Sequence, residues 1–465
     1  MKKCISVLII SFVAIFSQAQ FNIIPQPSSV KQGDGNFTVS SSTILQIASN
    51  DADVKRIAGE LNAALKRAAG FELKTGISGK NVISFGLTNN TSLGNEGYQL
   101  SVSKDAVNVS ANKSAGLFYG LQSLLQLFPA EIESKSIVKN IQWNIPVVEI
   151  QDQPRFGWRG TMLDVSRHFF TKDEVKSFID DMAKYKYNTL HFHLTDDQGW
   201  RIEIKSLPKL TEVGAWNVKK TGRFNYFSAP GDDEPRNFGG FYTQEDLKEL
   251  IKYAKEKFVE IVPEIDIPGH SLAAVASYPE LSCTPGTYKV NSGEPFMDWH
   301  DNGTFTARVD NTLCPANEKV YEFLDKVFTE VAAIFPHPYI HMGGDECAKN
   351  FWEINPQIKE LMQKEKLKDM HEVQAYFVSR VSKIVSSKGK KLIGWDEILE
   401  GGLVKDAAVM SWRGMKGGIE AAKMGHEVVM TPTTYVYVDY MQGDASIEPP
   451  VYATLRLRSE EHTSE

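Results

Sequence analysis

From Gln153 onward, short apolar runs alternate with longer segments of helical period. The apolar runs, interpreted as strands, are residues 158–165, 189–194, 259–265, 339–342, 392–395, 409–412 and 428–431. The expected helices between them include residues 172–185, 244–258, 318–335 and 370–387. Such alternation predicts a parallel sheet, because each helix returns the chain to start the next strand in the same direction. No glycine-rich phosphate loop follows the first strand, which favours an α/β fold of the (β/α)8 TIM-barrel type over a doubly wound sheet.

The chain is long enough for a second, smaller domain ahead of the barrel. Residues 21–150 have α+β character, with a helical period around Val54 and a predicted hairpin over residues 98–111. No group of catalytic residue types clusters there, so we interpret this region as a packing domain. The barrel is expected over residues 151–457 and has seven recognisable strands. Residues 458–465 have no apolar period, so we interpret them as a non-native tail and the barrel as truncated before its last strand.

The first 20 residues have the pattern of a signal peptide. Lys2 and Lys3 precede an apolar run, Cys4–Phe16, which is too short to span a bilayer well. We therefore expect export to the periplasm or cell exterior, with no membrane span in the mature chain. Export permits disulfides, and Cys283 and Cys314, both in the segment before the fourth strand, are the predicted pair. The net charge of −7, without a basic stripe, gives no indication of nucleic-acid binding.

Polar or aromatic residues follow each expected strand at its carboxyl end. In strand order they are Arg167, Asp196, His270, Asp345 with Glu346, Trp395, Trp412, and Tyr437 with Asp439. Each taken alone is unremarkable, because an arginine after a strand is usually solvated and a buried tryptophan usually belongs to the core. Seven strand ends in phase on one face of a barrel are better explained as an active site.

The two adjacent carboxylates, Asp345 and Glu346, follow two glycines that let the backbone bend close to a ligand. Like charges this close raise the pKa of one carboxyl, which is how an acid stays protonated near neutral pH. Carboxylates, tryptophans and an arginine suit a carbohydrate, and no metal triad accompanies them. A conventional retaining glycosidase holds its two carboxylates roughly 5 Å apart across the sugar. Neighbouring residues can hardly straddle a sugar ring, so the sequence favours the 2-acetamido oxygen of the substrate as nucleophile.

The stretch His-Met-Gly-Gly-Asp-Glu, residues 341–346, resembles the signature of the β-N-acetylhexosaminidases of glycoside hydrolase family 20. The similarity covers residues from about Phe21 to Leu455, with several motifs in the same order. It implies a retaining, substrate-assisted exo-enzyme that needs no cofactor and no metal and removes terminal GlcNAc or GalNAc from an oligosaccharide or glycan.

The resemblance also implies a role for each site residue. Glu346 would be the general acid and then the base, and Asp345 would orient the acetamido N–H. Asp196 and His270 would form a relay supporting the acid. His270 can instead be a structural histidine, because Pro-Gly-His is turn-like. The remaining implied roles concern substrate binding: the acetamido carbonyl for Tyr437, the walls of the acetamido pocket for Trp395 and Trp412, and the outer sugar hydroxyls for Arg167 and Asp439.

The sequence departs from the family where a last strand carrying a Trp and a Glu is expected. Two alternatives therefore stay open: a carbohydrate-binding protein without turnover, and an inactive fragment of such an enzyme. The sequence also leaves open GlcNAc against GalNAc, the natural substrate and the oligomeric state.

Overall fold

The computed structural model describes residues 22–438 apart from 78, 221–226, 302–303 and 403. The proposed signal peptide, Asp439 and the proposed non-native tail lie outside these residues. The chain forms two compact units, which divide between Arg155 and Phe156. No helix in the described part of the chain is both long and apolar enough to cross a membrane.

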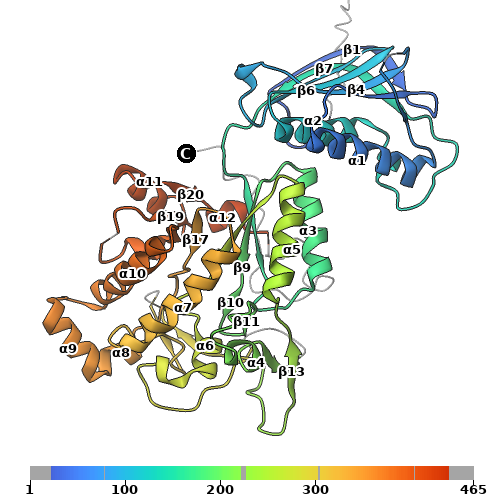
Figure 1. Cartoon of the computed structure of the whole chain (residues 1–465). Coiled ribbons are helices and arrows are strands. Elements are labelled where there is room, and N and C mark those ends of the chain that lie inside the picture. The colour runs from blue at the N-terminus through green and yellow to red at the C-terminus, as the bar shows by residue number, and fades with distance from the viewer. Residues whose placement is uncertain (1–21, 78, 221–226, 302–303, 403, 439–465) are drawn as a thin grey trace, which may run out of the picture. The chain divides into compact units, whose positions relative to one another are not determined.

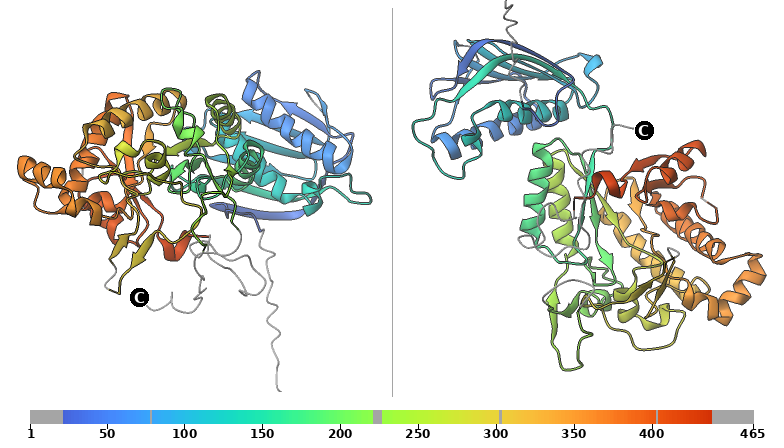
Figure 2. Two further views of the ribbon diagram at one scale, coloured as in Figure 1. Left: turned by 90° about the horizontal axis from the view of Figure 1, so that it is seen from below. Right: turned by 180° about the vertical axis from the view of Figure 1, so that it is seen from behind.

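The first unit is a seven-stranded mixed sheet with two helices on one face (Figures 1 and 2). The strand order is β1-β7-β5-β6-β4-β2-β3. The strands are β1 Ser29–Thr38, β2 Ile44–Ile47, β3 Lys74–Thr75, β4 Val82–Leu87, β5 Tyr98–Val102, β6 Ala106–Ala111 and β7 Asn144–Asp152. The helices are α1 Ala52–Ala69 and α2 Ser114–Leu127. The predicted hairpin is confirmed as the antiparallel pair β5–β6. The long strand β1 was missed because most of its residues are exposed and give no alternation.

The second unit contains a parallel sheet of seven strands in simple sequential order, as in a (β/α)8 barrel. The strands are β8 Gly160–Asp164, β9 Thr189–His193, β14 Glu260–Glu264, β17 Tyr339–His341, β18 Lys391–Trp395, β19 Ala408–Ser411 and β20 Val428–Met430. The covering helices are α3 Lys172–Lys184, α5 Gln244–Glu256, α7 Glu318–Ile334, α10 Met370–Ser387 and α11 Lys416–Lys423 (Figure 1). All seven predicted strands and the predicted helices are confirmed, with shifts of one or two residues at their ends.

Shorter elements follow the carboxyl ends of the strands and connect them to the helices. They are β10 Thr195–Asp196, β11 Gly199–Trp200, α4 Lys209–Glu212, β12 Trp216–Val218, β13 Arg236–Gly239, α6 Leu272–Ser277, β15 Met297–Trp299, β16 Phe305–Ala307, α8 Asn350–Ile354, α9 Pro356–Glu365 and α12 Thr433–Val436. The predicted disulfide is confirmed: Cys283 and Cys314 are bonded, and Cys347 is a buried free thiol.

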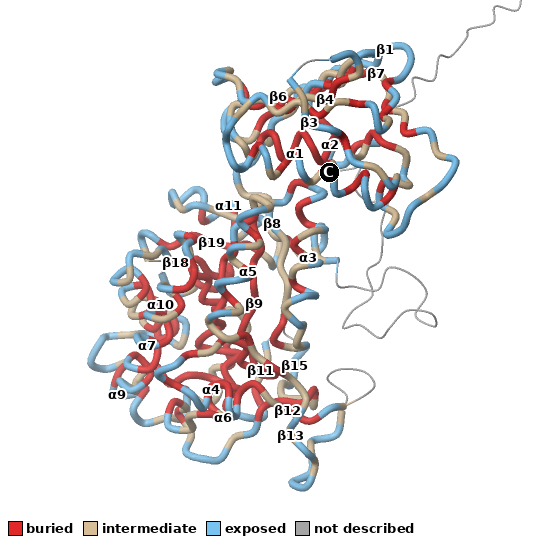
Figure 3. The backbone as a smooth tube through the Cα atoms, turned by 45° about the vertical axis from the view of Figure 1, so that its right-hand side comes forward, coloured by how far each residue is buried: buried red, intermediate tan, exposed pale blue. Residues whose placement is uncertain are grey.

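The two faces of the barrel strands have different compositions. In β9, Leu190 and Phe192 pack into the apolar layer beneath the helices, whereas the alternate residues His191 and His193 are buried on the other face. Figure 3 shows buried residues running along β9 to the end at which β11 lies. The interior face of β9 is therefore buried but polar, so its histidines need polar partners on the neighbouring strands.

Candidate active site

The turn after β17 positions the two adjacent carboxylates. Gly343 and Gly344 have φ of 67° and 99°, and Glu346 itself has φ of 42°. A Cβ on Gly343 would lie 1.7 Å from Oδ1 of Asp266, so only glycine fits there. The Gly344 N–H donates to the same Asp266 oxygen at 3.2 Å. The backbone thus folds tightly over Asp266 and presents Asp345 and Glu346 at the carboxyl end of the strand.

The structure brings Asp196, His270 and Glu346 together, as the resemblance implied. His270 Nδ1 lies 3.2 Å from Oδ1 of Asp196, and its Nε2 lies 3.5 Å from Oε2 of Glu346. Asp197 holds the same imidazole from a second side, with Oδ2 at 3.2 Å. Burial by itself would lower the pKa of His270, but Asp196, Asp197 and Glu346 together outweigh burial and raise this pKa well above the ordinary value. A buried imidazolium therefore stands between Asp196 and Glu346.

The protein raises the pKa of Asp345. Its side chain is 17% exposed, and burial first and Glu346 second raise its pKa to about 6. The sequence predicted such a shift for one of the two carboxyls from their mutual repulsion, but burial is the larger cause. Oδ1 of Asp345 is buried and has no hydrogen-bond partner among the described residues. A buried acceptor left open on a side chain that is itself partly exposed is suited to an N–H that arrives with a ligand.

Arg167 is held by two carboxylates and remains one-third exposed. Its guanidinium lies 3.0 Å from Oδ2 of Asp164 and 2.7 Å from Oδ2 of Asp196. Asp196 therefore touches both the predicted relay histidine and the predicted substrate arginine. The arginine fork is fixed in place while part of it stays open to solvent.

One group of site residues was missed: the three histidines that surround Glu264. His193 Nδ1, His191 Nε2 and His341 Nδ1 lie 2.6, 2.8 and 3.1 Å from the Glu264 carboxylate. Strand register explains the meeting, because Glu264 pairs with His193 on β9 and with His341 on β17. The signal available in the sequence was His-x-His in one strand and a lone histidine in another, which gives no information about the strand between them.

The two predicted tryptophan walls are anchored by carboxylates. The Trp395 indole N–H donates to Oε1 of Glu264 at 3.0 Å, and the Trp412 indole N–H donates to Oε2 of Glu397 at 2.9 Å. Trp395 is 5% exposed. Glu397 belongs to a short 3₁₀ turn, Asp396–Leu399, directly after β18. Burial first and Asp345 second raise the pKa of Glu397 to about 8, so it is a further site residue that the sequence prediction did not assign.

The structure describes Tyr437 but not Asp439, the other residue predicted after the last strand. Tyr437 follows α12 directly and is half-buried, whereas Asp439 lies outside the described residues. Trp352 is fully buried, with its N–H bonded to Thr312 Oγ1 at 2.9 Å. The structure supports packing for Trp352.

Several groups in the barrel have the composition of metal ligands. They are His191–Glu264–His341, His193–Glu264–Asp266, Asp196–Asp266–His270 and His270–Asp345–Glu346, and the ligand atoms of each lie within 4.8 Å of one another. Imidazole–carboxylate contacts join the members of these groups, and some of their buried atoms, such as Asp266 Oδ2 and His341 Nε2, have no hydrogen-bond partner among the described residues. That the reaction needs no metal or cofactor stays a prediction.

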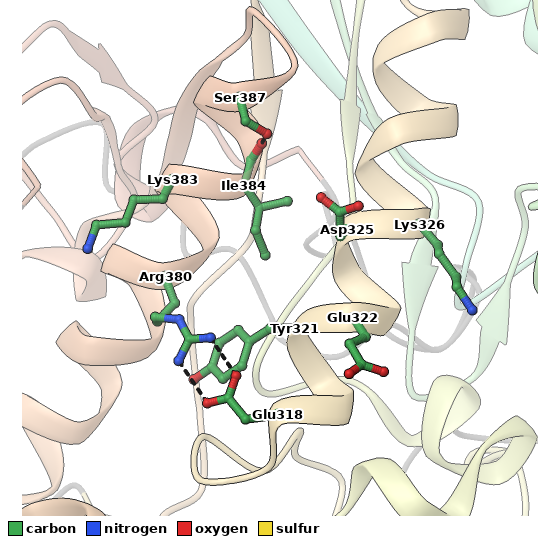
Figure 4. A pocket seen from close by; sticks show the side chains of 9 residues that line it. All are labelled: Glu318, Tyr321, Glu322, Asp325, Lys326, Arg380, Lys383, Ile384 and Ser387. Carbon is green, nitrogen blue, oxygen red and sulfur yellow. Dashed lines mark hydrogen bonds and ion pairs between the residues drawn. The ribbon is translucent and has the colours of Figure 1, made fainter.

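A hollow between α7 and α10 is unrelated to these residues (Figure 4). Arg380 lies across it, bonded to both carboxylate oxygens of Glu318 at 3.0 and 2.7 Å. Its guanidinium also lies 3.8 Å from the ring centre of Tyr321. These contacts join two neighbouring helices, so the hollow is part of helix packing.

A parallel barrel with paired carboxylates, a buried relay and anchored tryptophans at its carboxyl end defines a glycoside hydrolase of the barrel type. Comparison with known proteins gives the family. Residues 156–464 match the model of glycosyl hydrolase family 20, catalytic domain, and residues 20–153 match that of glycosyl hydrolase family 20, domain 2. The chain belongs to glycosyl hydrolase family 20.

Individual relatives agree with this assignment. The chain is 41% identical over 431 residues to the beta-hexosaminidase of Porphyromonas gingivalis, covering 92% of this chain and 52% of that protein. It is 34% identical to the beta-hexosaminidase of Vibrio furnissii, covering 93% of this chain and 66% of that protein. The chain thus spans about half to two thirds of these relatives. The solved GH20 beta-N-acetylhexosaminidase from Streptomyces coelicolor A3(2) superimposes with a TM-score of 0.76 at 32% identity, over 93% of this chain and 79% of that one.

Proposed function

We propose that the protein is an exo-acting β-N-acetylhexosaminidase that removes terminal β-linked GlcNAc or GalNAc with retention of configuration. The observation that carries the proposal is the division of labour between two adjacent carboxylates. Glu346 faces the His270 imidazolium at 3.5 Å, whereas Asp345 keeps a buried oxygen without a partner among the described residues. The names of the relatives support the same activity.

In the proposed reaction Glu346 gives its proton to the glycosidic oxygen as the bond to the anomeric carbon breaks. The 2-acetamido oxygen of the substrate attacks that carbon and forms a cyclic oxazolinium ion. Glu346, now a carboxylate, removes a proton from the water that opens the ring, and this returns the proton to Glu346. General acid–base catalysis of this kind contributes about 10²- to 10⁴-fold to the rate.

Asp345 is proposed to act on the acetamido group. Its open Oδ1 accepts the acetamido N–H, which orients the carbonyl oxygen for attack. Its negative charge then stabilises the positive charge that develops on the ring. Because burial and Glu346 raise the pKa of Asp345 to about 6, this charge is present at neutral pH and lost in mild acid.

Arg167, Trp395, Trp412 and Tyr437 are proposed to bind the terminal sugar. The fixed and partly exposed guanidinium of Arg167 suits sugar hydroxyls. The tryptophan faces suit the C–H surfaces of the acetamido sugar. The substrate proposed is an oligosaccharide or glycan, and no nucleic-acid partner is proposed.

Export is also part of the proposal. The disulfide between Cys283 and Cys314 supports an oxidising compartment, and the residue pattern of the first 20 residues is that of a signal peptide. We propose a periplasmic or extracellular protein.

The test compares two substrates in the wild type and in Glu346→Gln. The substrates are 4-nitrophenyl N-acetyl-β-D-glucosaminide, which has a good leaving group, and N,N′-diacetylchitobiose, which has a poor one. We expect Glu346→Gln to reduce kcat/KM on the disaccharide by at least about 10²-fold and on the nitrophenyl glycoside by less, because a good leaving group needs little protonation.

Glu353→Gln is the matched control, because Glu353 is an exposed glutamate on the neighbouring helix α8. It is expected to behave as wild type. Equal activity of the wild type on plain glucosides would contradict the acetamido assignment. Tight sugar binding without product release would identify a binding protein instead.

A further inference from the structure

The connection between β14 and α7 carries a small hairpin, β15–β16, with an exposed aromatic pair. Trp299 and Phe305 face each other across the two strands, with ring centroids 4.9 Å apart. Trp299 is 54% exposed, which is unusual for a tryptophan, the side chain with the largest apolar area. Neither residue has a role in the reaction described above.

The hairpin has one apolar and one polar face, because side chains alternate along each strand. Met297, Trp299, Phe305 and Ala307 share the apolar face, and its burial decreases from Ala307, which is 5% exposed, to Trp299. On the polar face Arg308 binds Asp298 through two nitrogens, at 2.6 and 3.0 Å from Oδ1. The aromatic pair is therefore presented outward by a hairpin that its own polar face holds in shape.

The base of the hairpin is attached to the segment that follows the proposed acid. Asn350, four residues after Glu346, donates to the Ala307 carbonyl and accepts from the Ala307 N–H, both at 3.0 Å. A two-stranded hairpin alone is marginally stable in water. These two bonds replace the missing neighbouring strand and fix the hairpin on the Glu346 side of the site.

The roots of the hairpin are attached to the relay. Asn291 N donates to the Asp197 carbonyl at 3.1 Å, and Asn311 Nδ2 donates to Asp197 Oδ2 at 3.0 Å. Asp197 is the carboxylate that also contacts His270. Both ends of the 291–311 segment therefore meet at one buried aspartate, at the end of the barrel where β11 and β15 lie (Figure 3).

This placement determines which part of a substrate the hairpin can meet. A general acid must face the glycosidic oxygen, so the side of the site on which it lies is the side from which the leaving group departs. A surface anchored to the acid's own loop and to its relay lies on that side. An exposed indole backed by a second ring is the surface that stacks on a sugar.

We propose that Trp299, supported by Phe305, binds the sugar of the leaving group and so makes the enzyme prefer oligosaccharides to simple glycosides. This inference rests on the proposed function. It identifies the chemistry of the substrate on the far side of the cleaved bond, namely a second pyranose ring, and it leaves the reaction itself to Glu346 and Asp345.

The test compares N,N′-diacetylchitobiose with methyl N-acetyl-β-D-glucosaminide, which has an equally poor leaving group but no second ring. For Trp299→Ala we expect kcat/KM on the disaccharide to fall about tenfold, corresponding to one well-placed aromatic contact. The change on the methyl glycoside is expected to be less than about twofold. Trp299→Phe should recover most of the loss. Ile354→Ala truncates another exposed apolar side chain, on α8, and should leave kcat/KM unchanged on both substrates.

Equal losses on both substrates, or no loss on the disaccharide, would overturn the role of Trp299. A wild type inactive on both substrates would overturn the proposed function instead. In that case sugar binding tests the inference. The affinity of the Glu346→Gln variant for each sugar is compared with that of the double variant Glu346→Gln, Trp299→Ala. The indole should strengthen binding of the disaccharide and leave binding of free N-acetylglucosamine unchanged. Equal effects on both sugars would refute it.

Discussion

Glu264 is a buried carboxylate and Asp345 a largely buried one on a neighbouring part of the same barrel, yet their environments are opposite. Burial raises the pKa of both, but His193, His341 and His191 hold the pKa of Glu264 well below its ordinary value. Asp345 lies beside Glu346 and near Glu264, and its pKa rises to about 6. The difference teaches that burial alone does not determine the pKa of a carboxylate in this barrel, because the charges of its neighbours set the direction of the shift.

The two groups should respond to pH in opposite ways. A depressed pKa adds stability that is present above the unfolded pKa and is lost as pH falls through the folded pKa, which is the case for Glu264. A raised carboxyl pKa costs stability as pH rises from the unfolded value, 3.8, to the folded value of about 6, which is the case for Asp345. Glu264 therefore stabilises the fold at neutral pH, and Asp345 destabilises it there.

The largest effect is expected from Glu264→Gln. Removing the charge leaves the His193 imidazolium, whose pKa is raised mainly by Glu264 against the effect of burial, without its principal partner. We expect the free energy of unfolding to fall by about 4 kcal/mol at pH 7, measured by urea denaturation of the full chain. Glu353→Gln is the control. A loss below about 1 kcal/mol would show that His193 is a neutral neighbour of Glu264 and would refute the contrast between Glu264 and Asp345.

Asp345→Asn should increase the free energy of unfolding, whereas Glu264→Gln decreases it. The same substitution should cause a large loss of activity. Removing a charge whose pKa is raised from 3.8 to about 6 is expected to increase the free energy of unfolding by up to about 3 kcal/mol at pH 7. The gain should disappear near pH 4. Activity on N-acetylated substrates is expected to fall about 10²- to 10³-fold. Denaturation at several pH values and initial rates check both parts, and a destabilised variant at pH 7 would refute the account of Asp345.

His270→Gln should have a smaller effect. It tests whether the neighbours of Asp345 determine the pKa of that carboxyl. The imidazolium of His270 lowers the pKa of Asp345, so without it that pKa rises further. The acidic limb of kcat/KM should move to higher pH, and kcat/KM at neutral pH should fall about ten- to a hundredfold, as for other supporting residues. A lower rate with an unmoved acidic limb would mean that His270 acts only on Glu346.

The sequence was sufficient for the barrel because its central parallel strands carry buried apolar residues, and most of its long helices are amphipathic and capped. In α3, for example, Thr171 and Glu174 form a capping box at the predicted start. The strand ends then followed from topology, which is why Asp196, His270 and Glu346 could be expected to meet. Motif order and strand phase carry that information.

The sequence was not sufficient where function depends on register or on small loop structures. Glu264 was not predicted as a site residue, because its importance arises from His191, His193 and His341 on two other strands. The hairpin around Trp299 was missed because its strands are three residues long and half exposed. A pattern that short has no reliable period.

The disulfide between Cys283 and Cys314 encloses the whole hairpin segment, with the two cysteines 31 residues apart. A bridge of that span adds about 3 to 4 kcal/mol by restricting the unfolded chain. The bridge also fixes both ends of the loop between Cys283 and Cys314. The length of this loop can change at little entropic cost, because closure entropy grows only with the logarithm of loop length. In the proposed enzyme the barrel can thus keep its reaction centre while the enclosed loop is exchanged, so that new glycan preferences can evolve.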